Sequence, residues 1–233
     1  FKDADKEITR DLKERNLLLH SERYKHSYPF CWRCDTPLLQ FASKSWFVRT
    51  TAIRDRLVAK NLTIDWHPEA IGKARFGNWL EGVVDWALSR KRYWGTPLPI
   101  WKCDLCPAER VFSSFAELLH EAGRKVPEDL YDRAQFDPHR PNIDDITWEC
   151  YGCRDQGRNG VFRRVDDVID AWYDSGAMPF AQHHYPFENS EKVAPGGRFR
   201  PADFISEAID QTRGWFYTLH VLACALFDSV AFE

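Results

Sequence analysis

The stretch PADFISEAIDQTRGWFYTLHVLACALF, residues 201–227, decides the fold. Ala202–Ile205 predicts a short strand, and Asp210 is a residue type that caps helices well, so it is expected to begin the next helix. Apolar residues recur at helical spacing along that helix and give it a face to bury. In α/β folds, ligands lie at the carboxyl ends of parallel strands, near the helices that follow. We therefore expect Glu207, Asp210 and Gln211 to face a nucleotide or adenylate site.

The helix itself is open to two interpretations. Gln211 and Trp215 are one turn apart and are expected to share a face, while Gly214 permits close approach of the backbone to a ligand. A capped amphipathic helix whose polar residues simply face solvent explains the segment equally well. This segment alone does not separate a binding site from a surface helix.

The cysteines of the chain are mostly paired. Six of the seven form three CxxC pairs: Cys31/Cys34, Cys103/Cys106 and Cys150/Cys153. The chain opens with a charged helical run and no signal-peptide pattern, which favours a reducing, cytoplasmic setting and metal binding over disulfides. The remaining cysteine, Cys224, lies in the apolar helix, where a buried thiol acts as a small hydrophobic group.

The second and third pairs predict a structural zinc site. Cys103, Cys106, Cys150 and Cys153 supply the four thiolates of a closed tetrahedral site, although unrelated thiols are the alternative. Such a site leaves no position open for water, so it is not expected to be catalytic. Cys31 and Cys34 are expected either to form half of a second site with cysteines upstream or to be merely reduced and buried.

Composition excludes several classes of protein. The chain has 233 residues, 44% of them hydrophobic, and a formal charge of −3, which indicates a globular protein without a global basic field. The longest apolar stretch, near 215–227, is too short and too polar to span a membrane. The basic run Arg90, Lys91 and Arg92 has two interpretations, a contact with phosphate or RNA and a structural or solvated basic turn.

Periodicity also predicts the remaining elements. Helices are expected at 4–19, 51–60, 76–89 and 113–123, and strands at 61–67 and 161–165. The helix at 76–89 would carry Trp79, Val83 and Trp86 on one face. Between the second and third CxxC pairs the sequence becomes polar and loop-like, whereas the segments on either side are rich in aromatic residues. We therefore interpret 102–165 as an insertion folded around a metal.

Four motifs occur together in one order: CWRC…KSWF near the start, SRKRYWGTPLPIW (89–101), AWYDSG (171–176) and DQTRGW (210–215). In order and spacing they resemble the isoleucyl-tRNA synthetases, a family of class I aminoacyl-tRNA synthetases, and the resemblance covers essentially the whole chain. It implies an α/β fold: a partial Rossmann-type catalytic domain with an inserted zinc-ribbon-like module. The implied domains are 1–45 (end of an upstream insertion with the CxxC half-site), 46–101 (catalytic helices and strands), 102–165 (zinc-binding insertion) and 166–233 (second part of the catalytic domain).

The resemblance also implies an activity and a site. Members of the family activate isoleucine with ATP and Mg²⁺ to isoleucyl-adenylate and transfer it to tRNA(Ile). Trp172 and Trp215 would flank the isoleucine side chain. The remaining implied contacts are Asp174 and Gln211 with the substrate, and Glu207, Asp210 and Gln211 with the adenylate.

The sequence departs from the family in lacking HIGH-type and KMSKS-type motifs, which stabilise the ATP phosphates. We therefore expect an internal fragment that is inactive alone, with the editing insertion upstream and the anticodon-binding region downstream. The complete enzyme is expected to be a cytoplasmic monomer with no membrane association. The alternatives are a fragment of a valine-specific class I synthetase and a stand-alone zinc-ribbon interaction module.

Overall fold

The chain divides into two units, residues 1–44 and 45–233, and the computed structural model describes residues 4–40 and 42–233. The first unit contains helix α1 (Ala4–Glu14) followed by extended chain and a tight turn around Cys31 and Cys34. The helix expected at 4–19 is therefore shorter than predicted. Asn16 has a φ of +53°, a left-handed conformation that ends a helix.

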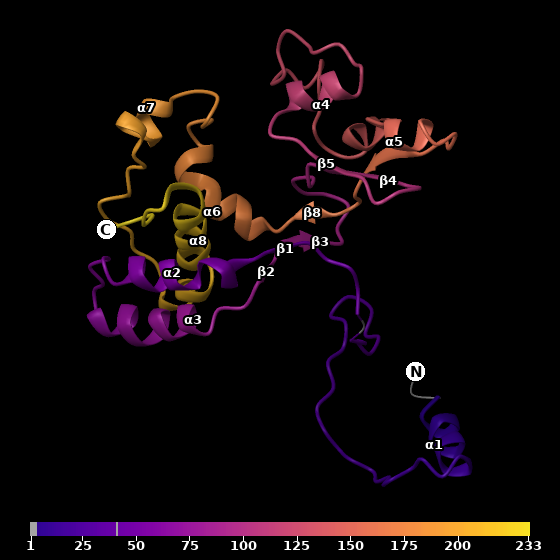
Figure 1. Cartoon of the computed structure of the whole chain (residues 1–233). Coiled ribbons are helices and arrows are strands. Elements are labelled where there is room, and N and C mark those ends of the chain that lie inside the picture. Colours follow the sequence, from indigo (N-terminus) through magenta and orange to yellow (C-terminus); the bar gives the residue numbers. More distant parts are fainter. Residues whose placement is uncertain (1–3, 41) are drawn as a thin grey trace. The chain divides into compact units, whose positions relative to one another are not determined.

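The second unit has a helical part built around α8 (Trp215–Phe227), which packs against α2 and α6 (Figure 1). The other helices of this part are α2 (Arg54–Asn61), α3 (Gly77–Glu81), α6 (Ala171–Ala181) and the short α7 (Ser190–Val193). Every residue of α8 from Phe216 to Cys224 is buried, so this helix lies at the centre of the apolar core. Among the described helices, none is both long enough and apolar enough to cross a membrane.

His220 is fully buried in the middle of α8. Its Nε2–H donates to the main-chain oxygen of Leu57 on α2 at 2.9 Å. Burial lowers the pKa of His220 to about 4, so the ring is neutral near pH 7. The imidazole therefore links α8 to α2 without introducing a buried charge.

The sheets of this unit are small and antiparallel. Two are two-stranded, β1 (Phe47–Val48) with β2 (Trp86–Ala87) and β3 (Ser89–Arg90) with β8 (Val168–Ile169). The third has the order β5-β4-β7-β6, with strands Glu109–Val111, Ile100–Cys103, Val161–Arg164 and Trp148–Glu149. Helices α4 (Phe115–Glu121) and α5 (Tyr151–Arg154) lie in the same part of the chain.

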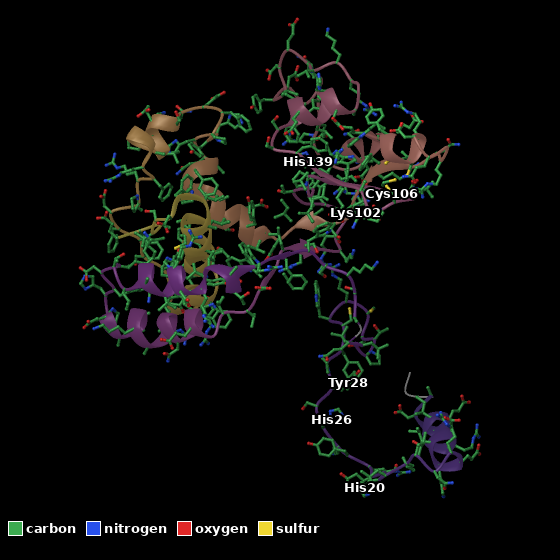
Figure 2. The ribbon with its side chains drawn as sticks, viewed as in Figure 1. His20, His26, Tyr28, Lys102, Cys106 and His139 are labelled. Atoms are coloured by element: carbon green, nitrogen blue, oxygen red, sulfur yellow. The ribbon has the colours of Figure 1, made fainter. Side chains whose placement is uncertain are left out.

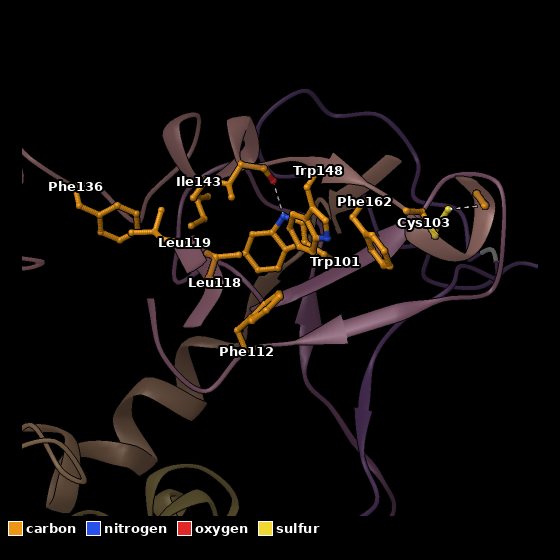
Figure 3. Close-up of a cluster of buried hydrophobic side chains, with 12 residues drawn as sticks. Trp101, Cys103, Phe112, Leu118, Leu119, Phe136, Ile143, Trp148 and Phe162 are labelled. Carbon is orange, nitrogen blue, oxygen red and sulfur yellow. Dashed lines mark hydrogen bonds between the residues drawn. The ribbon is translucent and has the colours of Figure 1, made fainter. Parts of the chain in front are cut away.

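The four-stranded sheet has its own aromatic core (Figure 3). Trp101 is 1% exposed, and its indole N–H donates to the main-chain oxygen of Ile146 at 2.7 Å. Trp148 stacks on Phe162 with ring centroids 5.1 Å apart. Because the two indoles and their neighbours fill this core, residues 100–164 have apolar packing independent of α8.

Two expectations for the middle of the chain are wrong. The helix expected at 76–89 ends at Glu81, and Trp86 instead pairs in β2 and donates its indole N–H to Asp170. The strand expected at 61–67 is a turn. Asn61 organises that turn, because its amide donates to the Gly72 oxygen at 3.1 Å and accepts from the Trp66 indole at 2.9 Å.

The strand and cap expected before α8 are also wrong. Ala202 makes only an isolated parallel bridge with Phe232, and the described residues contain no parallel sheet. Asp210 lies inside a 3-10 turn, Ile209–Arg213, and α8 begins only at Trp215. Gln211 is responsible for this start, since its side-chain oxygen accepts the Trp215 backbone N–H at 2.9 Å.

A leucine of helix α2 and a leucine directly after it test the importance of the helical core. Leu57 is 0% exposed and Leu62, directly after the helix, is 69% exposed. We expect Leu57→Ala to lower the free energy of unfolding by about 2–5 kcal/mol, because it leaves a cavity against α8. Leu62→Ala should change it by no more than about 0.5 kcal/mol. Urea denaturation of the two variants measures both values, and equal effects would contradict the assigned core.

Candidate functional site

The four cysteines of the second and third CxxC pairs come together at one end of the four-stranded sheet. Cys103 ends β4, Cys106 lies in the following turn (Figure 2), and Cys150 and Cys153 bracket the first turn of α5. All four sulfurs lie within 4.8 Å of one another. The structure therefore closes a loop of some fifty residues, from Cys103 to Cys153, at a single point.

The sulfur separations fit a tetrahedral zinc ion. The Sγ atoms of Cys103 and Cys153 are 3.7 Å apart, as are those of Cys106 and Cys150. Four sulfurs bound to zinc at ~2.3 Å in tetrahedral geometry would be ~3.8 Å apart. A disulfide requires about 2.05 Å, so the pairs are not bonded to each other. The donor set and its spacing thus suit a metal held by four thiolates.

Backbone groups hold the two cysteine turns in shape. The Leu105 N–H donates to the sulfur of Cys103 at 3.4 Å, and the Cys103 N–H donates to the Ala108 oxygen at 3.0 Å. The Cys150 N–H donates to the Gly160 oxygen at 2.8 Å, which ties α5 to the start of β7. These bonds hold the backbone of both cysteine turns and so orient the sulfurs toward one another.

The thiols differ in acidity. Burial raises the pKa of Cys153 to about 12. Burial also opposes ionisation of Cys103, but hydrogen bonds from the Leu105 N–H and Cys106 bring the pKa of that thiol to about 7. A divalent metal must displace the protons that remain near neutral pH, so metal binding here would release protons.

Gly160 is a residue of this site that sequence reasoning missed. A β-carbon at this position would lie 2.7 Å from the Cys153 sulfur and 2.8 Å from the Cys103 sulfur. Only glycine lets the backbone pass so close to both sulfurs. The available signal was a glycine directly before the predicted strand, inside the segment between the cysteines.

Cys31 and Cys34 form a similar turn in the first unit. The Cys31 N–H donates to the Thr36 oxygen at 2.9 Å, and the Cys34 thiol lies 3.1 Å from the Thr36 hydroxyl. That hydroxyl is the main cause of a lowered pKa of Cys34. Within residues 4–40 and 42–233, no third metal-binding side chain joins this pair. Its role as half of a site stays a prediction.

The predicted amino-acid site lies where α6 and α8 begin. The indole N–H of Trp215 donates to the Ser175 oxygen at 3.0 Å, and its backbone N–H is held by Gln211. Trp172, in the first turn of α6, is 43% exposed. A β-carbon on Gly214 would lie 3.1 Å from the Trp172 ring and 2.8 Å from the Gln211 side-chain oxygen. The structure thus brings both tryptophans and Gln211 to one junction.

Asp174 lies on the same helix as Trp172. The Thr96 hydroxyl donates to its two carboxylate oxygens, at 3.1 and 3.2 Å. Partial burial raises the pKa of Asp174, and the nearby Asp170 charge acts in the same direction while Thr96 opposes both. The carboxylate is therefore oriented by a residue of the SRKRYWGTPLPIW segment.

The two predicted acidic contacts are placed differently. Glu207 is exposed and lines a separate cavity of about 590 Å³, together with Trp66, Phe216 and Phe232. Neither tryptophan of the α6–α8 junction, nor Gln211, lines that cavity. Asp210 is exposed and accepts a long hydrogen bond, 3.4 Å, from the Gln211 amide. The six predicted residues therefore do not share one cavity.

Two residues of the basic run at 90–92 form ion pairs with carboxylates. Arg90 lies 2.7 Å from Asp170, and Lys91 lies 2.8 Å from Asp167. Both carboxylates are buried. Sequence reasoning missed these two aspartates, although the sequence DDVID directly before AWYDSG was a visible signal. For Arg90 and Lys91 the structure favours the structural turn over a free basic patch.

Comparison with known proteins identifies relatives along the entire chain. A family model described as tRNA synthetases class I (I, L, M and V) matches residues 4–233. The isoleucine–tRNA ligases of Dehalococcoides mccartyi and Thermus thermophilus are 49% and 52% identical over 233 residues, and that of Streptomyces coelicolor is 51% identical over 236 aligned positions. These alignments cover 100% of this chain but only 21–22% of each relative, so the chain spans about a fifth of their length.

Metal analysis tests the four-cysteine site. We expect the purified chain, kept reduced and supplied with zinc, to hold one tightly bound ion that Cys103→Ser removes, because a closed site needs all four thiolates. Cys224→Ser is the matched control, since that thiol is buried in α8 away from the cluster. Elemental analysis after dialysis measures the zinc. A chain without zinc under these conditions would contradict the assignment.

A second prediction concerns the glycine beside the sulfurs. Gly160→Ala should weaken zinc binding by roughly 10- to 100-fold, as changes just outside a metal's ligands commonly do. Gly152→Ala is the control, because a β-carbon there meets no atom within 4 Å even though the residue lies between two ligands. Competition with a chromophoric chelator measures both affinities. Equal zinc affinities for the two variants would show that zinc binding does not require the close approach of the Gly160 backbone to the two sulfurs.

Proposed function

The chain belongs to the class I tRNA synthetase family, and we propose that it forms the amino-acid pocket and a structural zinc module of an isoleucine-specific enzyme. The complete enzyme would join isoleucine to ATP, giving isoleucyl-adenylate and pyrophosphate, and then transfer the isoleucyl group to tRNA(Ile). The identity of about half of all residues to isoleucine–tRNA ligases supports this specificity. Because the chain spans only about a fifth of those relatives, activity belongs to the complete protein.

The convergence of Trp172 and Trp215 at the α6–α8 junction is the observation that carries the proposal. Two indoles offer a large, rigid apolar surface, which suits a branched alkyl side chain. Trp215 is fixed by hydrogen bonds at both its indole and its backbone nitrogen, so its face is preorganised. In this proposal the tryptophans flank the isoleucine side chain, while Gln211 and Asp174 contact the polar end of the substrate.

No residue of this chain has to act as a nucleophile. In adenylate formation the substrate carboxylate attacks the α-phosphorus of ATP and pyrophosphate leaves, so positioning and electrostatic stabilisation carry the rate. The chain's residues bind and orient the amino acid. Glu207 and Asp210 remain proposed adenylate contacts, although Glu207 lines a cavity that does not include the indole pair. ATP arrives as its Mg²⁺ complex and is a substrate.

The zinc module has a supporting role. When bound, zinc would cross-link the turns at Cys103/Cys106 and Cys150/Cys153 and contribute folding free energy, with no position left for a reacting water. We assign 102–165 to this zinc-ribbon-like insertion, 46–101 and 166–233 to a partial Rossmann-type catalytic domain, and 1–45 to the end of an upstream insertion. The parallel bridge between Ala202 and Phe232 supports a parallel sheet in the complete protein.

The remaining features of the proposal concern the complete enzyme. Free thiols poised for metal suit a reducing compartment, which agrees with a cytoplasmic enzyme. We propose that it acts as a monomer on isoleucine, ATP and tRNA(Ile). The relatives are named for isoleucine, so a valine-specific enzyme is not favoured. A stand-alone zinc module is not favoured either, because the family model runs through the whole segment from residue 4 to residue 233.

Pyrophosphate exchange tests the proposal. We expect the complete protein to catalyse isoleucine-dependent exchange between ATP and pyrophosphate, with a higher kcat/KM for isoleucine than for valine. The chain of 233 residues alone should catalyse none, because its sequence contains no HIGH-type or KMSKS-type motif. Exchange that prefers valine would overturn the proposed specificity. Exchange by the short chain at the rate of the complete protein would overturn the assignment of its role.

A further inference from the structure

An ion pair between Arg90 and Asp170 joins two segments that are 80 residues apart in sequence. Arg90 lies in β3, which pairs with β8 directly before Asp170. The guanidinium Nη2 donates to Asp170 Oδ2 at 2.7 Å. The carboxylate is buried while the guanidinium is partly exposed, so the negative charge depends on its protein donors.

The Asp170 carboxylate serves three donors at once. Besides Arg90, its Oδ2 accepts the indole N–H of Trp86 at 3.0 Å. Its Oδ1 accepts the backbone N–H of Trp172 at 3.3 Å, which caps the first turn of α6. One carboxylate therefore connects the 86–90 segment to the backbone of the residue that carries the proposed substrate-binding indole.

Arg90 is equally committed to the protein. Its Nη1 donates to the main-chain oxygens of Ala87 and Ser89, at 2.6 and 3.1 Å. Together with the bond from Nη2 to Asp170, these contacts connect β2 and β3 to the residue directly before α6. These contacts use three of the five N–H donors of the guanidinium and hold it against the protein.

The start of α6 has little freedom at the pocket. The Trp172 ring lies only 3.1 Å from the position that a Gly214 β-carbon would take, so a shift of α6 moves the indole against or away from the start of α8. Closely packed elements of this kind transmit small displacements directly. The Trp172 indole is therefore packed against the start of α8, and its backbone N–H is held by Asp170.

We propose that Arg90 and Asp170 are positioning residues for the amino-acid pocket, acting through the N-terminal turn of α6. The inference rests on the proposed function, because that function assigns Trp172 to the isoleucine pocket. Neither residue touches that substrate. Their effect is to hold the indole at the distance from Trp215 that a branched side chain requires.

The test uses the complete enzyme and the exchange reaction, which contains no tRNA. Asp170→Ala removes the cap and the ion pair, and we expect the KM for isoleucine to rise ~10- to 100-fold, as for a displaced binding group. Asp170→Asn keeps an oxygen for the Trp172 N–H but loses the charge, so its KM should rise less. The KM for ATP should stay constant in both variants, a split that general damage to the fold would not give.

The control is Asp166→Asn, in the short connection between β7 and β8, four residues before Asp170. The Asp166 side chain is 87% exposed, and its Oδ1 lies 3.9 Å from Nη2 of Arg140. It should leave both KM values unchanged. If Asp170→Ala fails to fold, as judged by circular dichroism, Asp170→Asn and Arg90→Lys decide the question, and each should raise the KM for isoleucine several-fold.

An unchanged KM for isoleucine in the folded variants would overturn the inference. A defect confined to the KM for tRNA in the aminoacylation assay would also overturn it, and would assign Arg90 to an RNA phosphate. Failure of the proposed function has a different result, because the unaltered complete enzyme would then lack isoleucine-dependent exchange.

Discussion

Burial of α8 is the constraint on which the rest of the larger unit depends. One side of this helix supplies Tyr217 and Val221 to a core shared with α2, α3 and α6, and the other supplies Phe216 and Leu219 to a second core near the C-terminus. A helix buried on all sides cannot rotate or slide without opening cavities, so its first residue has a fixed position. That residue is Trp215, so the packed core around α8 also fixes one wall of the proposed pocket.

The apolar cores of the larger unit are separate clusters, and polar contacts connect the segments between them. The four-stranded sheet has its own aromatic core around Trp101, and four thiols gather at its edge. The connection from β3 to α6 depends on the Asp170 carboxylate, which is buried and satisfied by three donors. Buried charges are costly unless they are paired and hydrogen-bonded, so such a carboxylate specifies one arrangement of the chain. The proposed function uses that arrangement at the first turn of α6.

Local patterns in the sequence predicted elements well where side chains near in sequence make the deciding contacts. The helix at 113–123 and the strand at 161–165 are present as α4 and β7. The predictions failed where a distant partner decides. Trp86 has helical spacing with Trp79, but it forms a strand because it pairs with β1 and its indole N–H donates to Asp170. Likewise, Asp210 has the chemistry of a helix cap, yet the longer side chain of Gln211 reaches the Trp215 N–H instead.

The sequence by itself determined the chemistry that this protein carries. The spacing of four cysteines predicted a set that could bind a metal, and the order of AWYDSG and DQTRGW identified the family, because both depend on residue identity along the chain. Only the tertiary structure decided which groups meet. It separated Glu207 from the two tryptophans, placed Gly160 against the sulfurs and gave Arg90 a carboxylate partner. Those outcomes depend on distances between residues far apart in sequence, and such distances are set by how the buried helices and strands pack.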